Sequence, residues 1–279
     1  MSNCWLHGKT VVVTGASGGM GAGIAATLIK KHGCTVIGIA RNEQKMLNVI
    51  SELGEENAKR FSYRLFDVSV RENWEKFAEE LKESKTKIDI LINNAGILPK
   101  FKRFDRYSYE EIENAMNINF YSAVYSVKTL LPMILESSTP AVINIDSSAA
   151  LMTLAGTSIY SASKAALKAF TEALRTEFSG KMYVGLVCPG FTKTDIFRGQ
   201  TGVTIDRGAK AIDLISTDCD IMVKKIMLGI ELRMPMQIHG MDAHAMSIVN
   251  RMMPTRGSKL FSSVMRMAKI DLFKEVFFD

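Results

Sequence analysis

The sequence predicts an α/β fold in which a doubly wound, parallel β-sheet carries helices on both faces. Short apolar, β-rich runs recur along the chain, and the segments between them are long enough for crossover helices. These runs are apolar almost without interruption, which is typical of strands covered on both faces, because a half-exposed strand would alternate. The expected strands span Thr10 to Thr14, Thr35 to Ala40, Phe61 to Phe66, Ile88 to Ile92, Ala141 to Ile145 and Tyr183 to Val187.

Two helical stretches between these strands carry the side chains of greatest chemical interest. They run from Tyr109 to about Glu136 and from Ser158 to about Phe178. Near its C-terminus the chain predicts a last strand, Met236 to His239, followed by helices around Ala243 to Met253 and Ser258 to Lys274.

Length and composition predict a single domain. A chain of 279 residues with 47% hydrophobic and 23% charged residues can bury one large core. No internal repeat, low-complexity tract or clear linker divides it. Residues 1–233 are expected to form the dinucleotide-binding and catalytic core, and residues 234–279 to add the last strand and the amphipathic helices to the same domain.

Composition argues against several classes of function. The formal net charge of +6 is spread without a basic cluster or interleaved aromatic residues, so we expect no nucleic-acid partner. Four scattered cysteines lack the spacing of a zinc site or a disulfide framework, and we expect no bound metal. No apolar run approaches the roughly 18 residues of a membrane span, and no secretory signal is evident, so a cytoplasmic protein is expected.

A glycine-rich loop follows the first strand, in the segment Thr-Gly-Ala-Ser-Gly-Gly-Met-Gly at residues 14–21. An apolar helix comes directly after it, which is the context that a dinucleotide-binding loop requires. Glycine lets the backbone turn tightly and lets pyrophosphate oxygens reach the amide N–H groups at the start of the helix. The loop therefore predicts cofactor contacts from Gly15, Ser17, Gly18, Gly19, Met20 and Gly21.

The ends of the second and third strands indicate which dinucleotide binds. An acidic residue after the second strand would hydrogen-bond the ribose of NAD(H), but this chain has Arg41 there. A guanidinium can bind a 2′-phosphate with two hydrogen bonds, so NADP(H) is preferred over NAD(H); an ordinary solvated arginine is the alternative. Asp67, which precedes Val68, suits a hydrogen bond to the adenine amino group, or simply caps a turn.

Six motifs occur in the order and approximate spacing of the short-chain dehydrogenase/reductase family, which the chain resembles closely over about residues 8–195. They are the glycine loop, Asn-Asn-Ala-Gly at 93–96, Asn119, Ser147, Tyr-Ser-Ala-Ser-Lys at 160–164 and Pro-Gly-Phe-Thr-Lys-Thr at 189–194. This resemblance implies a Rossmann-type fold and a nicotinamide cofactor. It also implies hydride transfer between that cofactor and a carbonyl or secondary alcohol, in a homodimer or homotetramer.

Tyr160 and Lys164 stand one helical turn apart, and their chemistry suits carbonyl reduction. The alkoxide that reduction leaves needs a proton, and a phenol with a pKa of about 10 is a poor partner at neutral pH unless its anion is stabilised. Lys164 is expected to supply the positive charge that lowers the pKa of Tyr160. Ser147 is expected to hydrogen-bond the substrate oxygen. Ser148 competes for that role, but Ser147 precedes Tyr160 by thirteen residues, the register of the family.

The resemblance assigns roles to further residues. In the family, the residue matching Lys164 also holds the nicotinamide ribose, and the one matching Asn119 holds a water for proton exchange. Thr194 matches the residue that contacts the nicotinamide carboxamide, a contact that Thr192 could share. The remaining cofactor contacts are implied for Asn94, Ala95, Gly96, Pro189 and Gly190.

Asp146 is a departure from the family, which more often has a neutral residue before the serine. Two interpretations are open. The carboxylate either caps a turn without further consequence, or it perturbs the charge near the reaction centre.

Three loops that match the family least are expected to select the substrate: Ile97 to Tyr107, Leu151 to Thr157 and Phe191 to about Lys210. Their apolar side chains could line a hydrophobic pocket. These residues are Leu98, Phe101, Phe104, Leu151, Met152, Leu154, Phe191, Ile196 and Phe197. We therefore expect a hydrophobic ketone or secondary alcohol as substrate, as in a carbonyl reductase or hydroxysteroid dehydrogenase.

The C-terminal helices carry apolar residues at helical spacing, with basic residues among them. Packing against the core or a sister subunit is the favoured interpretation; a lid over a lipid-like substrate and a weak membrane-surface contact are the alternatives. Two other functions stay open, a non-catalytic dinucleotide-binding sensor and a lipid-surface binding protein. A sensor would be expected to lose the tyrosine or the lysine, and both are present.

Overall fold

The computed structural model of the protein describes residues 4–194, 216–267 and 273–278. In this part of the chain, seven parallel strands form one sheet in the order β3-β2-β1-β4-β5-β6-β7. The strands are β1 (Thr10–Thr14), β2 (Thr35–Ala40), β3 (Phe61–Leu65), β4 (Ile90–Asn93), β5 (Ala141–Ile145), β6 (Tyr183–Pro189) and β7 (Met236–His239). The predicted doubly wound sheet is confirmed, although β3 ends one residue early, β4 begins at Ile90 and β6 continues to Pro189.

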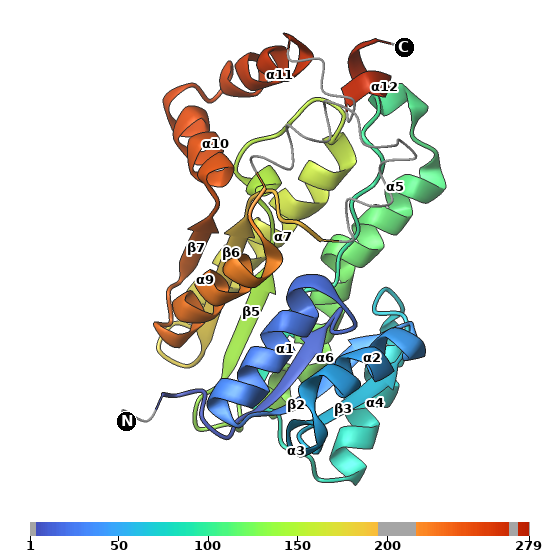
Figure 1. Cartoon of the computed structure of the whole chain (residues 1–279), viewed down its shortest axis with the longest axis vertical. Coiled ribbons are helices and arrows are strands. Elements are labelled where there is room, and N and C mark those ends of the chain that lie inside the picture. Colours follow the sequence, from blue (N-terminus) through green and yellow to red (C-terminus); the bar gives the residue numbers. More distant parts are fainter. Residues whose placement is uncertain (1–3, 195–215, 268–272, 279) are drawn as a thin grey trace.

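Helices surround this sheet (Figure 1). They are α1 (Gly19–His32), α2 (Glu43–Leu53), α3 (Glu55–Ala58), α4 (Arg71–Glu83), α5 (Tyr109–Met116), α6 (Ser122–Ile134), α7 (Ser158–Glu177), α9 (Cys219–Glu231), α10 (Met241–Met252), α11 (Gly257–Met267) and α12 (Lys274–Phe277). The helix expected from Tyr109 to Glu136 is interrupted, because a single π-helical turn, Asn117–Tyr121, separates α5 from α6. The helix expected from Ser258 begins as α11, and residues 268–272 lie outside the described part.

Alternate residues of the central strands enter two separate hydrophobic clusters, one on each face of the sheet. Val11 and Val13 of β1 belong to the cluster that contains Ile24 of α1, whereas Val12 belongs to the cluster that contains Trp74 of α4. Helices α1, α2 and α9 cover the first face, and α4, α6 and α7 cover the second. Both faces are therefore buried, which is why the strands read as continuous apolar runs.

Local hydrogen bonds fix where the helices beside the site begin. Helix α5 starts with a capping box, in which Ser108 Oγ accepts from the backbone N–H of Glu111 and the Glu111 carboxylate accepts from the backbone N–H of Ser108. Helix α2 starts after Asn42, whose side chain accepts from the backbone N–H of Lys45 over 2.9 Å. These caps set the direction of the chain on leaving β2 and on entering α5.

The strand order reverses at β1, which pairs with β2 on one side and with β4 on the other. Loops that leave the carboxyl ends of neighbouring strands diverge at such a point and leave a crevice between them. Most of the predicted site residues follow β1, β4, β5 and β6, and Arg41 and Asp67 follow β2 and β3, so the topology brings them to this one edge of the sheet.

The C-terminal helices lie at the same end of the molecule (Figure 1). They form a third hydrophobic cluster with the loops around Phe101 and Leu154, in which the rings of Phe101 and Phe273 meet edge to face, 5.3 Å between centroids. Ser262 Oγ accepts a hydrogen bond from the backbone N–H of Ala155 over 3.2 Å. The C-terminal helices therefore pack on their own chain, over two of the loops that are expected to select the substrate.

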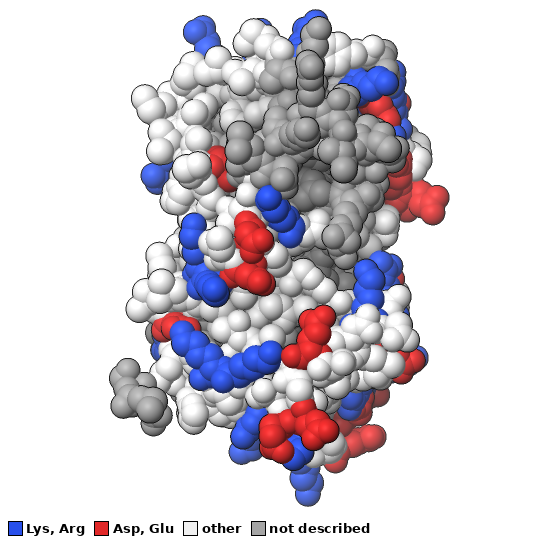
Figure 2. Space-filling model, in the orientation of Figure 1, with Lys and Arg blue, Asp and Glu red and all other residues white. Residues whose placement is uncertain are grey.

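Acidic and basic side chains are interspersed over the described part of the face drawn in Figure 2. Among residues 4–194, 216–267 and 273–278, the helices are too short or too polar to cross a bilayer. The same residues hold no group of three or more histidine, cysteine, aspartate or glutamate side chains arranged to bind a metal ion.

Candidate active site

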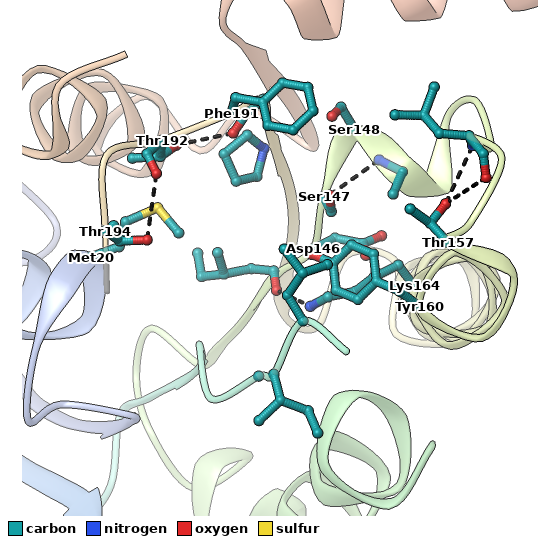
Figure 3. Close-up of a pocket in the computed structure, with 18 of the residues that line it drawn as sticks. Met20, Asp146, Ser147, Ser148, Thr157, Tyr160, Lys164, Phe191, Thr192 and Thr194 are labelled. Carbon is teal, nitrogen blue, oxygen red and sulfur yellow. Dashed lines mark hydrogen bonds between the residues drawn. The ribbon is translucent and has the colours of Figure 1, made fainter. Parts of the chain in front are cut away.

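A cavity that is partly open to solvent lies at the carboxyl ends of β4, β5 and β6. Figure 3 shows Asp146, Ser147, Tyr160 and Lys164 together on one side of this cavity. The other lining residues include Met20, Asn94, Gly96, Ile97, Leu98, Phe101, Ser148, Leu154, Thr157, Pro189, Gly190, Phe191, Thr192, Thr194 and Met246. The topology thus assembles in one place residues that are far apart in the sequence.

The side chains of Tyr160 and Ser147 both line the cavity, and Ser147 Oγ accepts from the backbone N–H of Ala149 over 3.1 Å. Tyr160 lies half-buried in the first turn of α7, and Ser147 follows β5 with an extended backbone. Burial raises the pKa of Tyr160 to about 12; the nearby hydroxyl of Ser147 opposes this rise and the negative charge of Asp146 adds to it. Ser148 also lines the cavity, but the hydroxyl that acts on the pKa of the phenol belongs to Ser147.

Lys164 is 4% exposed, and its Nζ donates to the backbone carbonyl of Ile145 over 3.2 Å. Burial lowers the pKa of Lys164, an effect that the negative charge of Asp146 opposes. The expected lowering of the pKa of Tyr160 by Lys164 is not the outcome in the protein alone. Burial of the phenol and the charge of Asp146 prevail, so the phenol holds its proton.

Asp146 caps no turn, because neither of its carboxylate oxygens has a hydrogen-bond partner among the described residues. Its side chain is 4% exposed. Burial raises the pKa of Asp146 to about 8, and the positive charge of Lys164 opposes that rise. Of the two interpretations of this residue, the structure favours the second, because an ionisable carboxyl group lines the cavity and caps no turn.

Asn119 lies in the π-helical turn, and its side chain makes three hydrogen bonds within the protein. Its Oδ1 accepts from the backbone N–H of Ile97 over 2.7 Å, and its Nδ2 donates to the carbonyl of Ile97 and to Ser163 Oγ. Asn119 therefore ties the loop after Gly96 to α7. The expected role in holding a water stays a prediction.

The glycine loop is shaped for close approach of backbone to a ligand. A Cβ on Gly21 would lie 2.2 Å from the carbonyl oxygen of Gly15, and one on Gly15 would lie 2.9 Å from Asn94 Nδ2. Gly18 precedes α1, no side chain caps the helix there, and nothing within 4 Å fills the space beside Gly18. The first N–H groups of α1 are thus available to an anion such as a pyrophosphate.

The segment Asn94 to Gly96 is held against this loop by Thr14. Thr14 Oγ1 accepts from the backbone N–H groups of Asn94 and Ala95, each over 2.9 Å, and Asn94 Nδ2 donates to the carbonyl of Thr14 over 3.0 Å. The chain therefore passes close to the crevice with its small residues facing it. Thr14 was not among the predicted site residues, although its place at the end of β1 beside the glycine loop was a usable signal.

A second cavity continues from the glycine loop toward the ends of β2 and β3. Its lining includes Gly15, Ser17, Ala40, Arg41, Asp67, Val68, Ala95 and Gly96. A groove behind it, between α1, α2 and α9, includes Gly18 and Gly19. With these, every predicted cofactor residue except Gly21 borders one of the three hollows, and Gly21 packs against the carbonyl of Gly15 in the loop itself.

Arg41 and Asp67 form an ion pair in this second cavity, 3.5 Å between Nη1 and Oδ2. Asp67 also accepts from the backbone N–H and the hydroxyl of Ser69. Burial acts to raise the pKa of Asp67, but the hydrogen bonds from Ser69 and the charge of Arg41 together bring it below its usual value. Sequence analysis treated Arg41 and Asp67 separately. Because they carry opposite charges and follow adjacent strands, the ion pair between them could have been predicted.

Asp242, at the start of α10, is a site residue that sequence reasoning missed. Its Oδ2 accepts from the backbone N–H of Phe191 over 2.7 Å, and its carboxylate fills the space that a Cβ on Gly190 would need. It thus holds the loop after β6, in which Thr192 Oγ1 donates to the carbonyl of Gly190 over 3.0 Å. Nothing in the local sequence around Asp242 indicated this contact.

The apolar wall of the first cavity differs in part from the expected one. Leu98, Phe101, Leu154 and Phe191 line it as expected, and Met246 of α10 joins them. Phe104 is 62% exposed, because its short 3₁₀ turn carries it away from the cavity. Met152 packs in the third hydrophobic cluster and Leu151 is not among the lining residues. Ile196 and Phe197 lie outside the described residues.

Comparison with known proteins places this site in a known family. The family described as short chain dehydrogenase matches residues 9–202. Among curated proteins, a ketoacyl reductase of Nostoc is 34% identical over 74% of this chain and 69% of its own length. A benzil reductase of Saccharomyces cerevisiae is 33% identical, over 68% and 73%. An 11-beta-hydroxysteroid dehydrogenase of Sesamum indicum is 30% identical over 79% of this chain, which spans only 62% of that relative.

Solved structures share the fold. A short chain dehydrogenase of Shigella flexneri in complex with NADP has a TM-score of 0.74 at 25% identity, with 85% of this chain and 99% of that chain covered. A serine dehydrogenase in complex with NADP⁺ has a TM-score of 0.73 at 26% identity, with 82% and 93% covered.

Proposed function

Because this chain belongs to the short chain dehydrogenase family, we propose that it is an NADP(H)-dependent oxidoreductase that interconverts a hydrophobic ketone and its secondary alcohol. One arrangement carries the proposal: Tyr160, Ser147 and Lys164 converge on a cavity that is also lined by large apolar side chains. The similar proteins named as a ketoacyl reductase, a benzil reductase and an 11-beta-hydroxysteroid dehydrogenase support a carbonyl or alcohol as the reacting group.

The residues of the crevice fit a dinucleotide. The uncapped start of α1 offers N–H donors and open space to a pyrophosphate, and Arg41 offers its guanidinium to a 2′-phosphate at the mouth of the second cavity. The NADP complexes of the similar structures support this choice of cofactor. When bound, the reduced cofactor would supply a hydride to the carbonyl carbon of the substrate.

Tyr160 supplies the proton in this proposal. Its phenol is protonated at neutral pH, since its pKa is raised, and it donates the proton to the substrate oxygen as negative charge develops there. Ser147, whose hydroxyl acts on the pKa of that phenol, stabilises the same oxygen. Lys164 is buried between Ile145 and Gly96, where its ammonium can hold the ribose hydroxyls next to the nicotinamide.

The substrate half of the cavity favours a bulky apolar compound. Phe101, Leu154, Phe191 and Met246 bury apolar surface of the substrate, while the polar side of the cavity orients its oxygen. The C-terminal helices cover these residues from outside, which supports the lid interpretation over a free-standing membrane anchor. The expected homodimer or homotetramer and the weak membrane contact stay predictions.

The experiment is a screen of hydrophobic ketones and hydroxysteroids with NADPH and NADH, following absorbance of the reduced nicotinamide. Tyr160→Phe should reduce turnover at least about 100-fold while NADPH binding, measured by fluorescence, stays nearly unchanged, because only the proton donor is lost. Tyr63→Phe is the matched control, since the Tyr63 hydroxyl bonds Glu43 at the surface, away from the cavity. Retained activity in Tyr160→Phe would refute the assigned role, and NADPH binding without turnover of any compound would favour the sensor.

A further inference from the structure

Helix α10 is buried on one face and exposed on the other. Its buried side chains are those of Asp242, Ala243 and Met246. The opposite face of a helix at a protein surface is normally polar. On α10 that face instead carries Met241, Ile248 and Met252, which are 85%, 56% and 77% exposed. A row of apolar side chains along this helix is therefore in contact with water.

Helix α11 is divided in a similar way. Phe261 and Met265 pack against the third hydrophobic cluster. Leu260, Val264 and Met267 recur at spacings of four and three residues, which places them on one face of the helix. They are 52%, 46% and 75% exposed. The packing of the C-terminal helices on the loops around the cavity thus covers only part of their apolar surface.

The two exposed rows are neighbours, because α10 and α11 contact each other. Only residues 253–256 separate the two helices, and the backbone N–H of Gly257 donates to the carbonyl of Met253 over 2.7 Å. A Cβ on Gly257 would lie 3.0 Å from Val249 Cγ1, so α11 starts directly against α10. We call the two rows together the outer apolar face. It consists of Met241, Ile248, Met252, Leu260, Val264 and Met267.

The formal charges in this part of the chain are all positive. From residue 243 to residue 267 the sequence has four Lys or Arg residues and no Asp or Glu. The four cations are exposed, and none of them forms an ion pair with a described residue. They are Arg251, Arg256, Lys259 and Arg266. Figure 2 shows the region of α10 and α11, at the upper left, as largely uncharged with Lys and Arg side chains near it.

We propose that the outer apolar face docks on a membrane surface that contains anionic lipids. The apolar side chains would leave water for the boundary between headgroups and acyl chains, and the cations beside them would meet lipid phosphates. The two helices would then lie in the plane of the interface. This docking is independent of the reaction proposed above, because none of the residues assigned to that reaction takes part in it.

The charges favour a lipid surface over a second copy of the chain as the occupant of this face. In a two-fold symmetric contact the same patch of both copies meets, so the cations of one copy would face those of the other. Residues 243–267 offer no carboxylate that could neutralise them. A bilayer with anionic headgroups supplies both the apolar layer and the opposite charge.

The first test is sedimentation of the full chain with vesicles of phosphatidylcholine alone or with about 30% phosphatidylglycerol added, which makes the surface negative. At about 0.05 M salt the protein should bind the anionic vesicles at least about tenfold more tightly than the neutral ones. At about 0.5 M salt this preference should fall below about twofold, because salt screens the charges. A chain that does not sediment with anionic vesicles at low salt overturns the proposal.

The second test removes the charges. Arg256→Gln combined with Lys259→Gln should weaken binding to anionic vesicles about 5- to 30-fold and change binding to neutral vesicles less than about twofold. The matched control is Lys82→Gln combined with Lys85→Gln, two exposed lysines in and just after α4, at the opposite end of the molecule (Figure 1). An equal loss in both double variants would show that net charge attracts the protein, and the proposal would fail.

The third test removes apolar surface and keeps the charge. Met252→Ser combined with Leu260→Ser should weaken binding to both kinds of vesicle at least about tenfold. Leu47→Ser combined with Leu135→Ser is the control, since these leucines are 44% and 40% exposed on other helices. Binding that both double variants retain at the wild-type level contradicts the assignment of this face.

Melting curves show that each variant is folded, and light scattering gives its mass. If Met252→Ser combined with Leu260→Ser does not fold, the single variants Ile248→Ser and Val264→Ser replace it, each with an expected loss of about threefold or more. An oligomer that dissociates in these variants, without vesicle binding by the wild type, would assign the face to a second copy and refute the lipid contact. Vesicle binding by a protein of unchanged mass, lost in the variants, supports it.

Discussion

The half of the site that faces the cofactor and the half that faces the substrate are built in different ways. Backbone groups and small residues at strand ends shape the cofactor half, as the contact between Gly21 and Gly15 shows. Large apolar side chains shape the substrate half, and Met246 and Phe273 come from the distant C-terminal segment. Rigid local turns therefore suit the cofactor, which is the same in every turnover. Long-range packing sets the shape of the pocket for the substrate, which differs between relatives.

The largest expected effect lies in the cofactor half. Gly21→Ala places a Cβ against the carbonyl of Gly15, and such overpacking against backbone should cost about 3 kcal/mol of unfolding free energy. Because the loop must shift, NADPH affinity should fall about 100-fold, as measured by calorimetry.

Gly18→Ala is the control for this prediction. Its Cβ enters open space and its φ of 176° is extended backbone that any residue adopts, so the melting temperature should hold. If both variants melt alike, the close approach of Gly21 and Gly15 is not what shapes the loop.

An intermediate effect is expected at the mouth of the cofactor half. Arg41→Ala should weaken NADPH by about 10- to 100-fold and NADH by less than about twofold, since a charge-assisted hydrogen bond contributes about 1.5–3 kcal/mol. Dissociation constants for both cofactors, with exposed Arg71→Ala as the control, measure the difference. An equal loss of affinity for NADPH and NADH would show that Arg41 does not bind the 2′-phosphate.

The smallest expected effect tests the substrate half. Phe273→Leu loosens the ring contact behind Phe101 and should raise KM for a bulky ketone a few-fold, at a cost of about 1 kcal/mol in stability. NADPH affinity should not change. Phe278→Leu, at a half-exposed position on the same segment, serves as the control. A loss of NADPH affinity equal to the rise in KM would show that the two halves are not separate.

The sequence predicted the strands and the glycine loop that frame the cofactor half, because each of these features depends on a few adjacent residues. The strands, the glycine loop and the pair of Tyr160 and Lys164 are local patterns with a fixed geometry. The π-helical turn at Asn117–Tyr121 was not predicted, since one extra residue in a turn hardly disturbs an apolar period. The prediction that Phe104 lines the pocket was wrong for a related reason. The sequence does not indicate in which direction an apolar side chain in a loop points.

The electrostatics of the site could be predicted only in part. Helical spacing correctly placed Lys164 near Tyr160, but the direction of the pKa shift of Tyr160 depends on burial and on Asp146 as well. Burial is a property of the folded chain and not of the motif. The contact of Asp242 with Phe191 was beyond prediction for the same reason, since it exists only once α10 has docked.

That contact restricts which residues can occupy two distant positions. The Asp242 carboxylate fills the volume that any side chain on Gly190 would need, and it also holds the amide of the next residue. A lineage that replaces the glycine must therefore shorten the aspartate, and one that shortens the aspartate loses the anchor of the loop after β6. Substitutions at 190 and 242 should therefore be inherited together. A residue near the C-terminus thus restricts which residue can occupy a position in the loop after β6.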